Sequence, residues 1–130
     1  MGKITIAIDG FSSTGKSTVA KQLADWLGYV FVDSGAMYRA VTLYAMRKGH
    51  ISTTVFNKRE LEECLDEISL SFKKENSSSK AEMYLNGENI EREIRLMTVS
   101  ELVSSVATIS SVRVKLVEQQ QQMGEGKGVV

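Results

Sequence analysis

Nine residues, Gly10 to Thr18 ("GFSSTGKST"), have the types and the spacing that phosphate chemistry requires. They fit the pattern G-x-x-x-x-G-K-[ST] and lie between an apolar run, "ITIAID", and a helical pattern. The glycines let successive backbone N–H groups turn inward around phosphate oxygens, and the N-terminus of the following helix faces the same anion. Lys16 then reaches the β- and γ-phosphates, and the Ser17 hydroxyl is a ligand for Mg²⁺. The stretch therefore predicts a site for a nucleotide polyphosphate with its magnesium ion.

The complete motif in its strand–loop–helix context argues against a glycine turn that binds nothing. We expect the nucleotide phosphates to contact Gly10, Ser12, Ser13, Thr14, Gly15, Lys16, Ser17 and Thr18. Such a loop occurs in GTPases, motor ATPases and small-molecule kinases alike. A guanine-reading Asn-Lys-x-Asp motif is not formed by residues 56–60 ("FNKRE"), which carry Glu60 at the last position. That segment predicts the start of a helix instead.

Composition narrows the class of protein further. The chain has 130 residues, 42% of them hydrophobic and 25% charged, which suits one globular domain. Sixteen basic residues balance sixteen acidic ones, so neither a nucleic acid polymer nor a membrane surface is expected as a partner. Cys64 is the single cysteine, which excludes an internal disulfide and favours a reducing compartment. With no signal-peptide pattern or membrane-spanning run, we expect a cytoplasmic location.

Alternating strands and helices must position the phosphate loop. Residues 3–9 predict a strand buried on both faces of a parallel sheet, and the helix after the loop stops at Gly28. Residues 29–33 predict a second short buried strand, and Ser34 is suited to cap the next helix, which Gly49 ends. The apolar stripe of that helix consists of Met37, Ala40, Val41, Tyr44 and Ala45. This order predicts an α/β fold, with a parallel sheet flanked by helices.

The pattern changes in the second half of the chain. Alternating apolar residues and the Asn86-Gly87 pair predict a small antiparallel meander over 66–95. Residues 96–130 return to helix, with a break near Ser110-Ser111, and end in the start of a third core strand. The glutamine run at 119–122 is most simply a solvated helix face. Three segments are expected: a first part of the core at 1–65, the meander at 66–95, and the return to the core at 96–130.

A longer stretch carries a family resemblance. "IDGFSSTGKSTVAKQLADWLGYVFVDSGAMYRAVT" closely resembles the start of bacterial cytidylate kinases, which are P-loop nucleoside monophosphate kinases. The discriminating part is "DSGAMYR" (33–39) at this distance from the P-loop. The resemblance continues through "GENIEREIR" (87–95) and "SVATISSVR" (105–113). It implies a P-loop kinase-type α/β fold whose antiparallel insert forms the monophosphate-binding region.

The resemblance also implies a second phosphate site. Ser34 and Arg39 would bind the phosphate of CMP, with the planar arginine donors clamping it as a fork. Ser104 and Arg113 would contact the cytosine ring. Tyr38 would line the monophosphate site, although a core aromatic fits that position equally well. From the residues alone, Arg39 would be interpreted as a solvated helix arginine.

The activity implied by the resemblance is transfer of the γ-phosphoryl group of ATP to CMP or dCMP, with Mg²⁺ as cofactor. Lys16 and Arg39 would be the catalytic residues, and Ser17 would hold the metal. Two alternatives stay open. One is a P-loop kinase for another small acceptor, such as another nucleoside monophosphate or shikimate. The other is a non-catalytic nucleotide-binding module.

The sequence departs from the family at its end. After "GVV" the family continues with an Asp-Gly-Arg-Asp segment and a lid that bears further arginines, whereas the chain stops at Val130. We therefore expect the N-terminal portion of a longer protein, with little or no kinase activity by itself. An exposed sheet edge would favour self-association. Phe11 replaces a proline that many members carry, which is a mild change in a turn.

Other residues with reactive side chains have simpler interpretations. Arg92 and Arg95 alternate with glutamates and are expected to form a charged surface. His50 follows the end of a helix without a cluster of metal ligands, so we assign it neither catalysis nor metal binding. Cys64 falls on the apolar stripe of a short helix and is expected to be buried.

Overall fold

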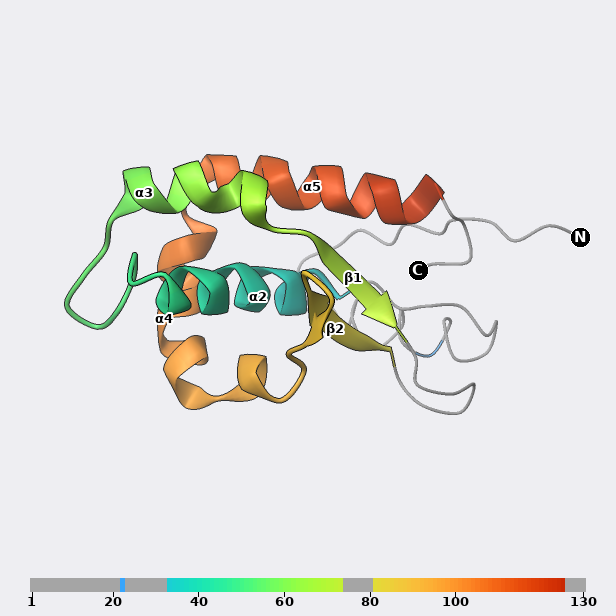
Figure 1. Ribbon diagram of the computed structural model, residues 1–130, viewed down its shortest axis with the longest axis horizontal. Coiled ribbons are helices and arrows are strands. Elements are labelled where there is room, and N and C mark those ends of the chain that lie inside the picture. Colours follow the sequence, from blue (N-terminus) through green and yellow to red (C-terminus); the bar gives the residue numbers. More distant parts are fainter. Residues whose placement is uncertain (1–21, 23–32, 74–80, 126–130) are drawn as a thin grey trace, which may run out of the picture.

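The fold is taken from a computed structural model, which describes residues 22, 33–73 and 81–125. The strand predicted at 3–9 and nearly all of the one predicted at 29–33 lie outside these residues. The parallel sheet therefore stays a prediction. The described part of the chain forms helices packed around one small antiparallel sheet (Figure 1).

Helix α2 (Ser34–Arg47) is central to the described part of the chain. It packs against α4 (Met97–Ala107), α5 (Ser110–Glu125), η3 (Glu93–Arg95) and β2 (Glu82–Leu85). The predicted stripe is confirmed, since four of its five members are buried and Tyr44 is half-buried. The helix ends as predicted at Gly49, which has a φ of +78°. There the His50 N–H donates to the Ala45 carbonyl at 2.9 Å and the Gly49 N–H to the Met46 carbonyl at 3.1 Å. This pair of bonds is a Schellman motif, which requires a left-handed residue and so favours glycine.

The segment after α2 is also helical where the sequence predicted it. Helix α3 (Lys58–Glu63) begins directly after Asn57 and continues into the 3₁₀ helix η2 (Cys64–Glu67). The start of a helix thus falls within residues 56–60, at Lys58. The apolar side chains of this segment all enter the core: Leu61, Cys64, Leu65 and Ile68.

The predicted meander is a three-stranded antiparallel sheet in the order β1 (Leu70–Lys73), β2 (Glu82–Leu85), β3 (Glu88–Asn89). The turn between β2 and β3 has positive φ at both central residues, 50° at Asn86 and 85° at Gly87. Those values are typical of the type I′ hairpin turn that Asn-Gly favours. The short β3 then leads toward η3, so the hairpin directs the chain back to α2.

Three further helical segments complete the described chain: η3 (Glu93–Arg95), α4 (Met97–Ala107) and α5 (Ser110–Glu125). The break between α4 and α5 falls at Thr108 and Ile109, just before the predicted position. In Figure 1, α5 runs along one side of the molecule, next to α3.

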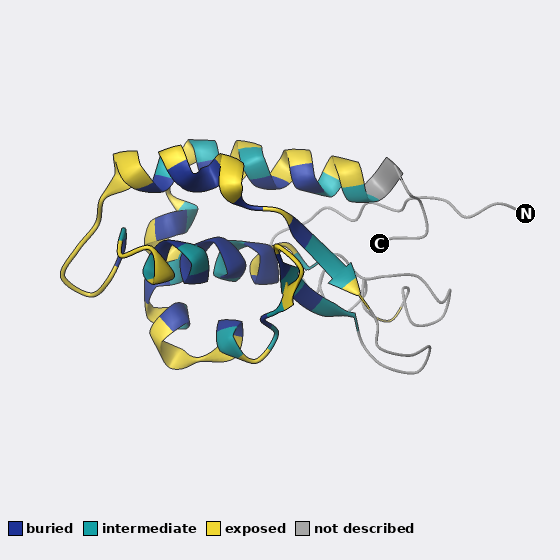
Figure 2. Ribbon diagram, viewed as in Figure 1, coloured by how far each residue is buried: buried dark blue, intermediate teal, exposed yellow. Residues whose placement is uncertain are grey.

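The core lies between α2, the sheet and the inner faces of α4 and α5. Figure 2 shows the buried residues of these elements in dark blue. One expectation about this region is wrong. Gln119 was predicted to lie on a solvated face, yet it is only 7% exposed. Its side-chain Oε1 accepts a hydrogen bond from the Leu70 N–H at 3.0 Å. The amide thereby satisfies the first backbone donor of β1, which would otherwise be buried without a partner.

Candidate functional site

The predicted ATP-phosphate residues, Gly10, Ser12, Ser13, Thr14, Gly15, Lys16, Ser17 and Thr18, all lie outside the described residues. Their roles stay predictions. The described part of the site is the segment 33–39, which forms the beginning of α2.

The N-terminus of α2 is capped by Asp33. Its side chain accepts a hydrogen bond from the Ala36 N–H at 3.2 Å, and the helix begins at the next residue. The expectation that Ser34 caps this helix is therefore wrong, and Ser34 is an exposed residue of the first turn. A carboxylate has the advantage in this position because the helix dipole favours negative charge there. A Cβ on Gly35 would lie 3.2 Å from the Asp33 carboxylate, so glycine lets the cap close over the first turn.

Arg39 lies one turn further along α2 and is half-buried. Its Nη1 donates to the Ile94 carbonyl at 3.2 Å and to the Ser100 hydroxyl at 2.6 Å. Both acceptors are electrically neutral, and both come from segments that are distant in sequence. Arg39 is therefore not a solvated helix arginine, as its sequence position alone would suggest. It holds the start of α2 against η3 and α4.

A network of charged side chains lies beside it. Arg95 donates from Nη2 to the Glu91 carboxylate at 3.0 Å, and the same nitrogen lies 3.9 Å from Asp33 Oδ2. The other Glu91 oxygen accepts from the Met83 N–H at 2.9 Å. Arg95 is half-exposed, as predicted for a surface pair with Arg92, but its contact with Asp33 was not expected. These bonds connect the start of α2 to η3 and β2.

The remaining described site residues differ in their surroundings. Tyr38 is half-buried and packs against the hydrophobic core, which agrees with the core-aromatic alternative. Its carbonyl accepts from the buried Thr42 hydroxyl at 2.8 Å. Ser104 on α4 and Arg113 on α5 are both exposed, and within the described residues neither side chain makes a hydrogen bond. The structure thus joins Arg39 to α4, the helix that also bears Ser104, whereas the Arg113 side chain makes no hydrogen bond or ion pair with them among the described residues.

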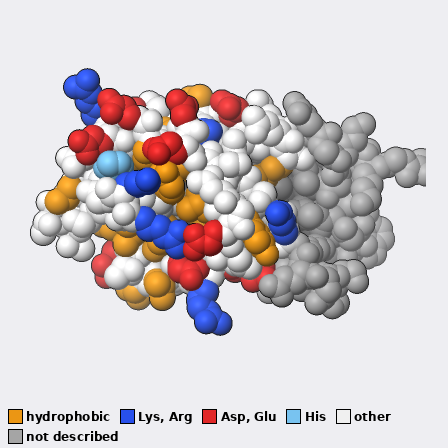
Figure 3. Space-filling view, in the orientation of Figure 1, with side chains coloured by type: hydrophobic (Ala, Val, Ile, Leu, Met, Phe, Trp, Pro, Cys, Tyr) orange, Lys and Arg blue, Asp and Glu red, His pale blue; other side chains and the backbone are white. Residues whose placement is uncertain are grey.

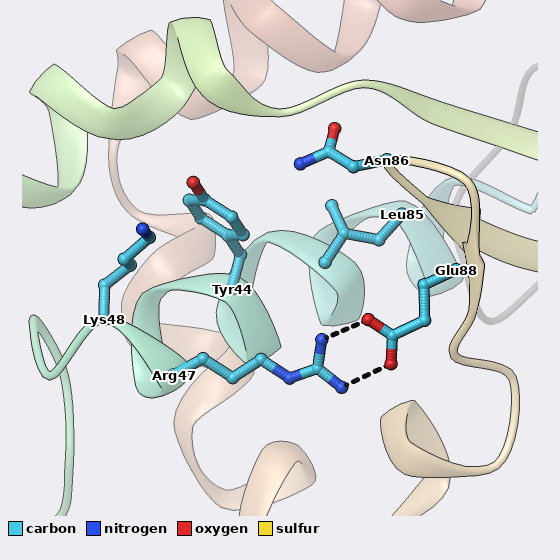
Figure 4. A pocket seen from close by; sticks show the side chains of 6 residues that line it. All are labelled: Tyr44, Arg47, Lys48, Leu85, Asn86 and Glu88. Atoms are coloured by element: carbon cyan, nitrogen blue, oxygen red, sulfur yellow. Dashed lines mark hydrogen bonds and ion pairs between the residues drawn. The ribbon is translucent and has the colours of Figure 1, made fainter.

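Two surface hollows lie away from these residues. One, of about 300 Å³, is lined by Tyr44, Arg47, Lys48, Leu85, Asn86 and Glu88 (Figure 4). It sits at the opposite end of α2 from Asp33, roughly 20 Å along the helix axis. The other, of about 440 Å³, lies between residues 51–56 and the C-terminal half of α4. It is lined in part by Leu102, Ser105 and Thr108. None of the predicted site residues lines either hollow.

The described residues contain no group of three or more His, Cys, Asp or Glu side chains that could hold a metal. His50 contacts one carboxylate, that of Glu60, at 3.2 Å. Cys64 is buried, and its burial raises the pKa of the thiol, so it stays protonated near neutral pH. Basic and acidic side chains are interspersed on the face shown in Figure 3. None of the described helices is both long and apolar enough to cross a membrane.

Sequence reasoning missed two members of this site, Ser100 and the Ile94 carbonyl. Ser100 lies four residues before Ser104 on α4, so both face the same side of that helix. That spacing is the one signal that could have drawn attention to it. The carbonyl has no side-chain signature, and only the three-dimensional structure reveals it.

Comparison with known proteins identifies the family of this chain. The predicted phosphate-binding loop, together with a half-buried arginine that pairs with no carboxylate of the described residues, is what a protein that binds nucleotide phosphates would be expected to have. Residues 6–130 match the family model for cytidylate kinase. The chain belongs to the cytidylate kinase family.

Curated relatives support the assignment along the whole chain. Over 130 residues it is 62% identical to a cytidylate kinase of Flavobacterium psychrophilum and 61% identical to one of Flavobacterium johnsoniae. A cytidylate kinase of Bacteroides thetaiotaomicron is 49% identical over the same length. All of this chain is covered in each case, whereas the chain spans 56–58% of the length of these relatives.

Proposed function

We propose that the protein encoded by the complete reading frame transfers the γ-phosphoryl group of ATP to CMP or dCMP. The observation that carries this proposal is the 62% identity to a cytidylate kinase over all 130 residues. The neutral anchoring of Arg39 adds a physical argument, because no acidic partner among the described residues neutralises its positive charge.

The chemistry is an in-line displacement. An oxygen of the CMP 5′-phosphate forms a bond to the γ-phosphorus as the bond from that phosphorus to the β,γ-bridging oxygen breaks, giving CDP and ADP. We assign Lys16 and the backbone N–H groups of 12–17 to the donor phosphates, and Arg39 to the acceptor phosphate. Positioning and charge neutralisation would supply most of the rate acceleration.

The cofactor and the base-contacting residues belong to the same proposal. When bound, Mg²⁺ would neutralise negative charge on the ATP phosphates, and the Ser17 hydroxyl would be one of its oxygen ligands. Ser34 and Tyr38 would lie near the acceptor phosphate, and Ser104 and Arg113 near the cytosine. The fold would be completed by a parallel sheet that carries the P-loop. We also infer a cytoplasmic protein that acts on free nucleotides.

The test is a coupled assay of ADP release with CMP, dCMP, UMP and AMP as acceptors. It uses the protein produced from the complete open reading frame. We expect turnover with CMP and dCMP, and a large loss in Arg39→Ala. Arg59→Ala is the matched control, because Arg59 is exposed on α3 and contacts only Glu63 among the described residues.

Two outcomes would count against the proposal. Indifference to CMP with turnover of another acceptor would indicate a kinase of different specificity. ATP binding that depends on Lys16, without phosphorylation of any acceptor, would indicate a non-catalytic nucleotide-binding module.

A further inference from the structure

The Arg39 guanidinium is held at one of its three nitrogens. Nη1 has two N–H groups, and it makes two hydrogen bonds, one to the Ile94 carbonyl at 3.2 Å and one to the Ser100 hydroxyl at 2.6 Å. A planar guanidinium that is bound through both hydrogens of one nitrogen has its plane and its direction fixed.

The other edge of the guanidinium makes no hydrogen bond to any residue that the structure describes. Nε and Nη2 carry the remaining N–H groups, and two of these point in parallel from the edge that faces away from Nη1. Within residues 33–73 and 81–125, no hydrogen bond engages them and no carboxylate lies within ion-pair distance of Arg39. A parallel pair of charged donors is the geometry that binds two oxygens of one phosphate group.

Both anchors are themselves held in place. Ile94 is fully buried, and its N–H donates to the Ile90 carbonyl at 3.0 Å. The Ser100 N–H donates to the Leu96 carbonyl at 3.2 Å in the first turn of α4, next to the buried Val99. The backbone positions of both acceptors are therefore fixed, which favours one orientation of the guanidinium.

We propose that Ser100 is a positioning residue, whose hydroxyl acts with the Ile94 carbonyl to aim the open edge of Arg39 at the acceptor phosphate. This inference rests on the proposed function. Because Ser100 and Ser104 lie one turn apart on α4, the same helix would fix the spacing between the phosphate contact and the base contact. Ser100→Ala would leave the guanidinium with one anchor and several orientations.

Steady-state kinetics of the complete protein test this role. We expect Ser100→Ala to raise the KM for CMP by about tenfold and to lower kcat, since misplacing a binding group weakens the transition state as well. The KM for ATP should stay unchanged. Ser100→Thr keeps the hydroxyl and should restore both values to within about twofold of the wild type. Ser105→Ala is the matched control, being the same change at an exposed position of the same helix.

A double-mutant cycle separates this inference from the proposed function. If Ser100 acts through Arg39, adding Ser100→Ala to Arg39→Ala should produce almost no further loss. Should Ser100→Ala fail to fold, Ser100→Cys, which keeps the volume with a poor acceptor, is compared with Ser100→Thr. Wild-type kinetics in Ser100→Ala, or equal changes in both KM values, would overturn the positioning role. Wild-type kinetics in Arg39→Ala would overturn the role assigned to Arg39, whereas absence of CMP phosphorylation by the wild type would overturn the proposed function itself.

Discussion

Two arginines on α2 differ in the charge of the groups that accept their hydrogen bonds. Arg47 makes two hydrogen bonds to the Glu88 carboxylate, at 2.9 and 3.1 Å, so an opposite charge compensates it on the surface. Arg39 is bound by a carbonyl and a hydroxyl, and no carboxylate of the described residues pairs with it. A half-buried cation without a counter-ion is costly unless a ligand supplies the negative charge. The difference between neutral and charged partners therefore supports the proposed anion-binding role of Arg39.

Replacement of Arg39 by lysine tests whether the fork matters beyond its charge. A lysine keeps the positive charge but has a single nitrogen, so it cannot hold both anchors and two phosphate oxygens together. We expect Arg39→Lys to lower kcat/KM for CMP roughly 100-fold, whereas Arg47→Lys should change it little. Full activity in Arg39→Lys, measured by ADP release, would mean that the charge alone suffices.

The Arg47–Glu88 pair predicts a pH effect of known sign. Hydrogen bonding to Arg47, and then the charge of Arg47, hold the pKa of the Glu88 carboxyl below its usual value. Because the folded pKa is lowered, the pair stabilises the fold above the ordinary glutamate pKa. That contribution disappears as the pH falls through the lowered folded value. Carbon-detected NMR titration should give Glu88 a depressed pKa that rises to the ordinary range of a glutamate in Arg47→Ala. Arg59→Ala should leave it depressed, and an unchanged pKa in Arg47→Ala would contradict the pairing.

At the scale of secondary-structure elements, one buried polar side chain joins α5 to β1. Gln119 lies on the inner side of α5, where its Oε1 accepts from the Leu70 N–H and its Nε2 donates to Gln122 at 3.3 Å. Leu70 is itself buried, so water cannot take the place of the amide. The glutamine thus fixes where α5 lies along the sheet edge, in addition to the apolar packing around it.

Removal of the Gln119 amide should destabilise the fold, because the amide is buried. Gln119→Ala leaves the Leu70 N–H buried without an acceptor, and we expect the free energy of unfolding to fall by about 1–3 kcal/mol. Gln121→Ala is the same change at an exposed position of the same helix, and it should have almost no effect. Urea unfolding followed by circular dichroism measures both, and equal stabilities would show that the hydrogen bond contributes nothing.

At the scale of the whole molecule, the sequence predicted local structure better than it predicted contacts between residues that are far apart in the chain. The stripe of α2, the glycine that ends it and the Asn-Gly turn each depend on a few adjacent residues, and the structure confirms all three. The bonds from Arg39 to Ser100 and from Leu70 to Gln119 join residues that are 61 and 49 positions apart. No spacing rule specifies such partners, because they depend on how finished helices pack. For the same reason, the resemblance identified Arg39 but gave no account of what holds it.

These long-range contacts place Arg39 where α2, η3 and α4 meet, so a ligand bound there should stabilise the whole assembly. A ligand that binds only the folded state adds RT ln(1 + [L]/Kd), about 2.7 kcal/mol at a hundred times its Kd. We therefore expect CMP alone to raise the Tm of the complete protein, and Arg39→Ala to abolish most of that increase. Each variant is compared with its own ligand-free form, so a change in basal stability does not affect the result. An Arg39→Ala protein that CMP stabilises as much as the wild type would place the acceptor phosphate elsewhere.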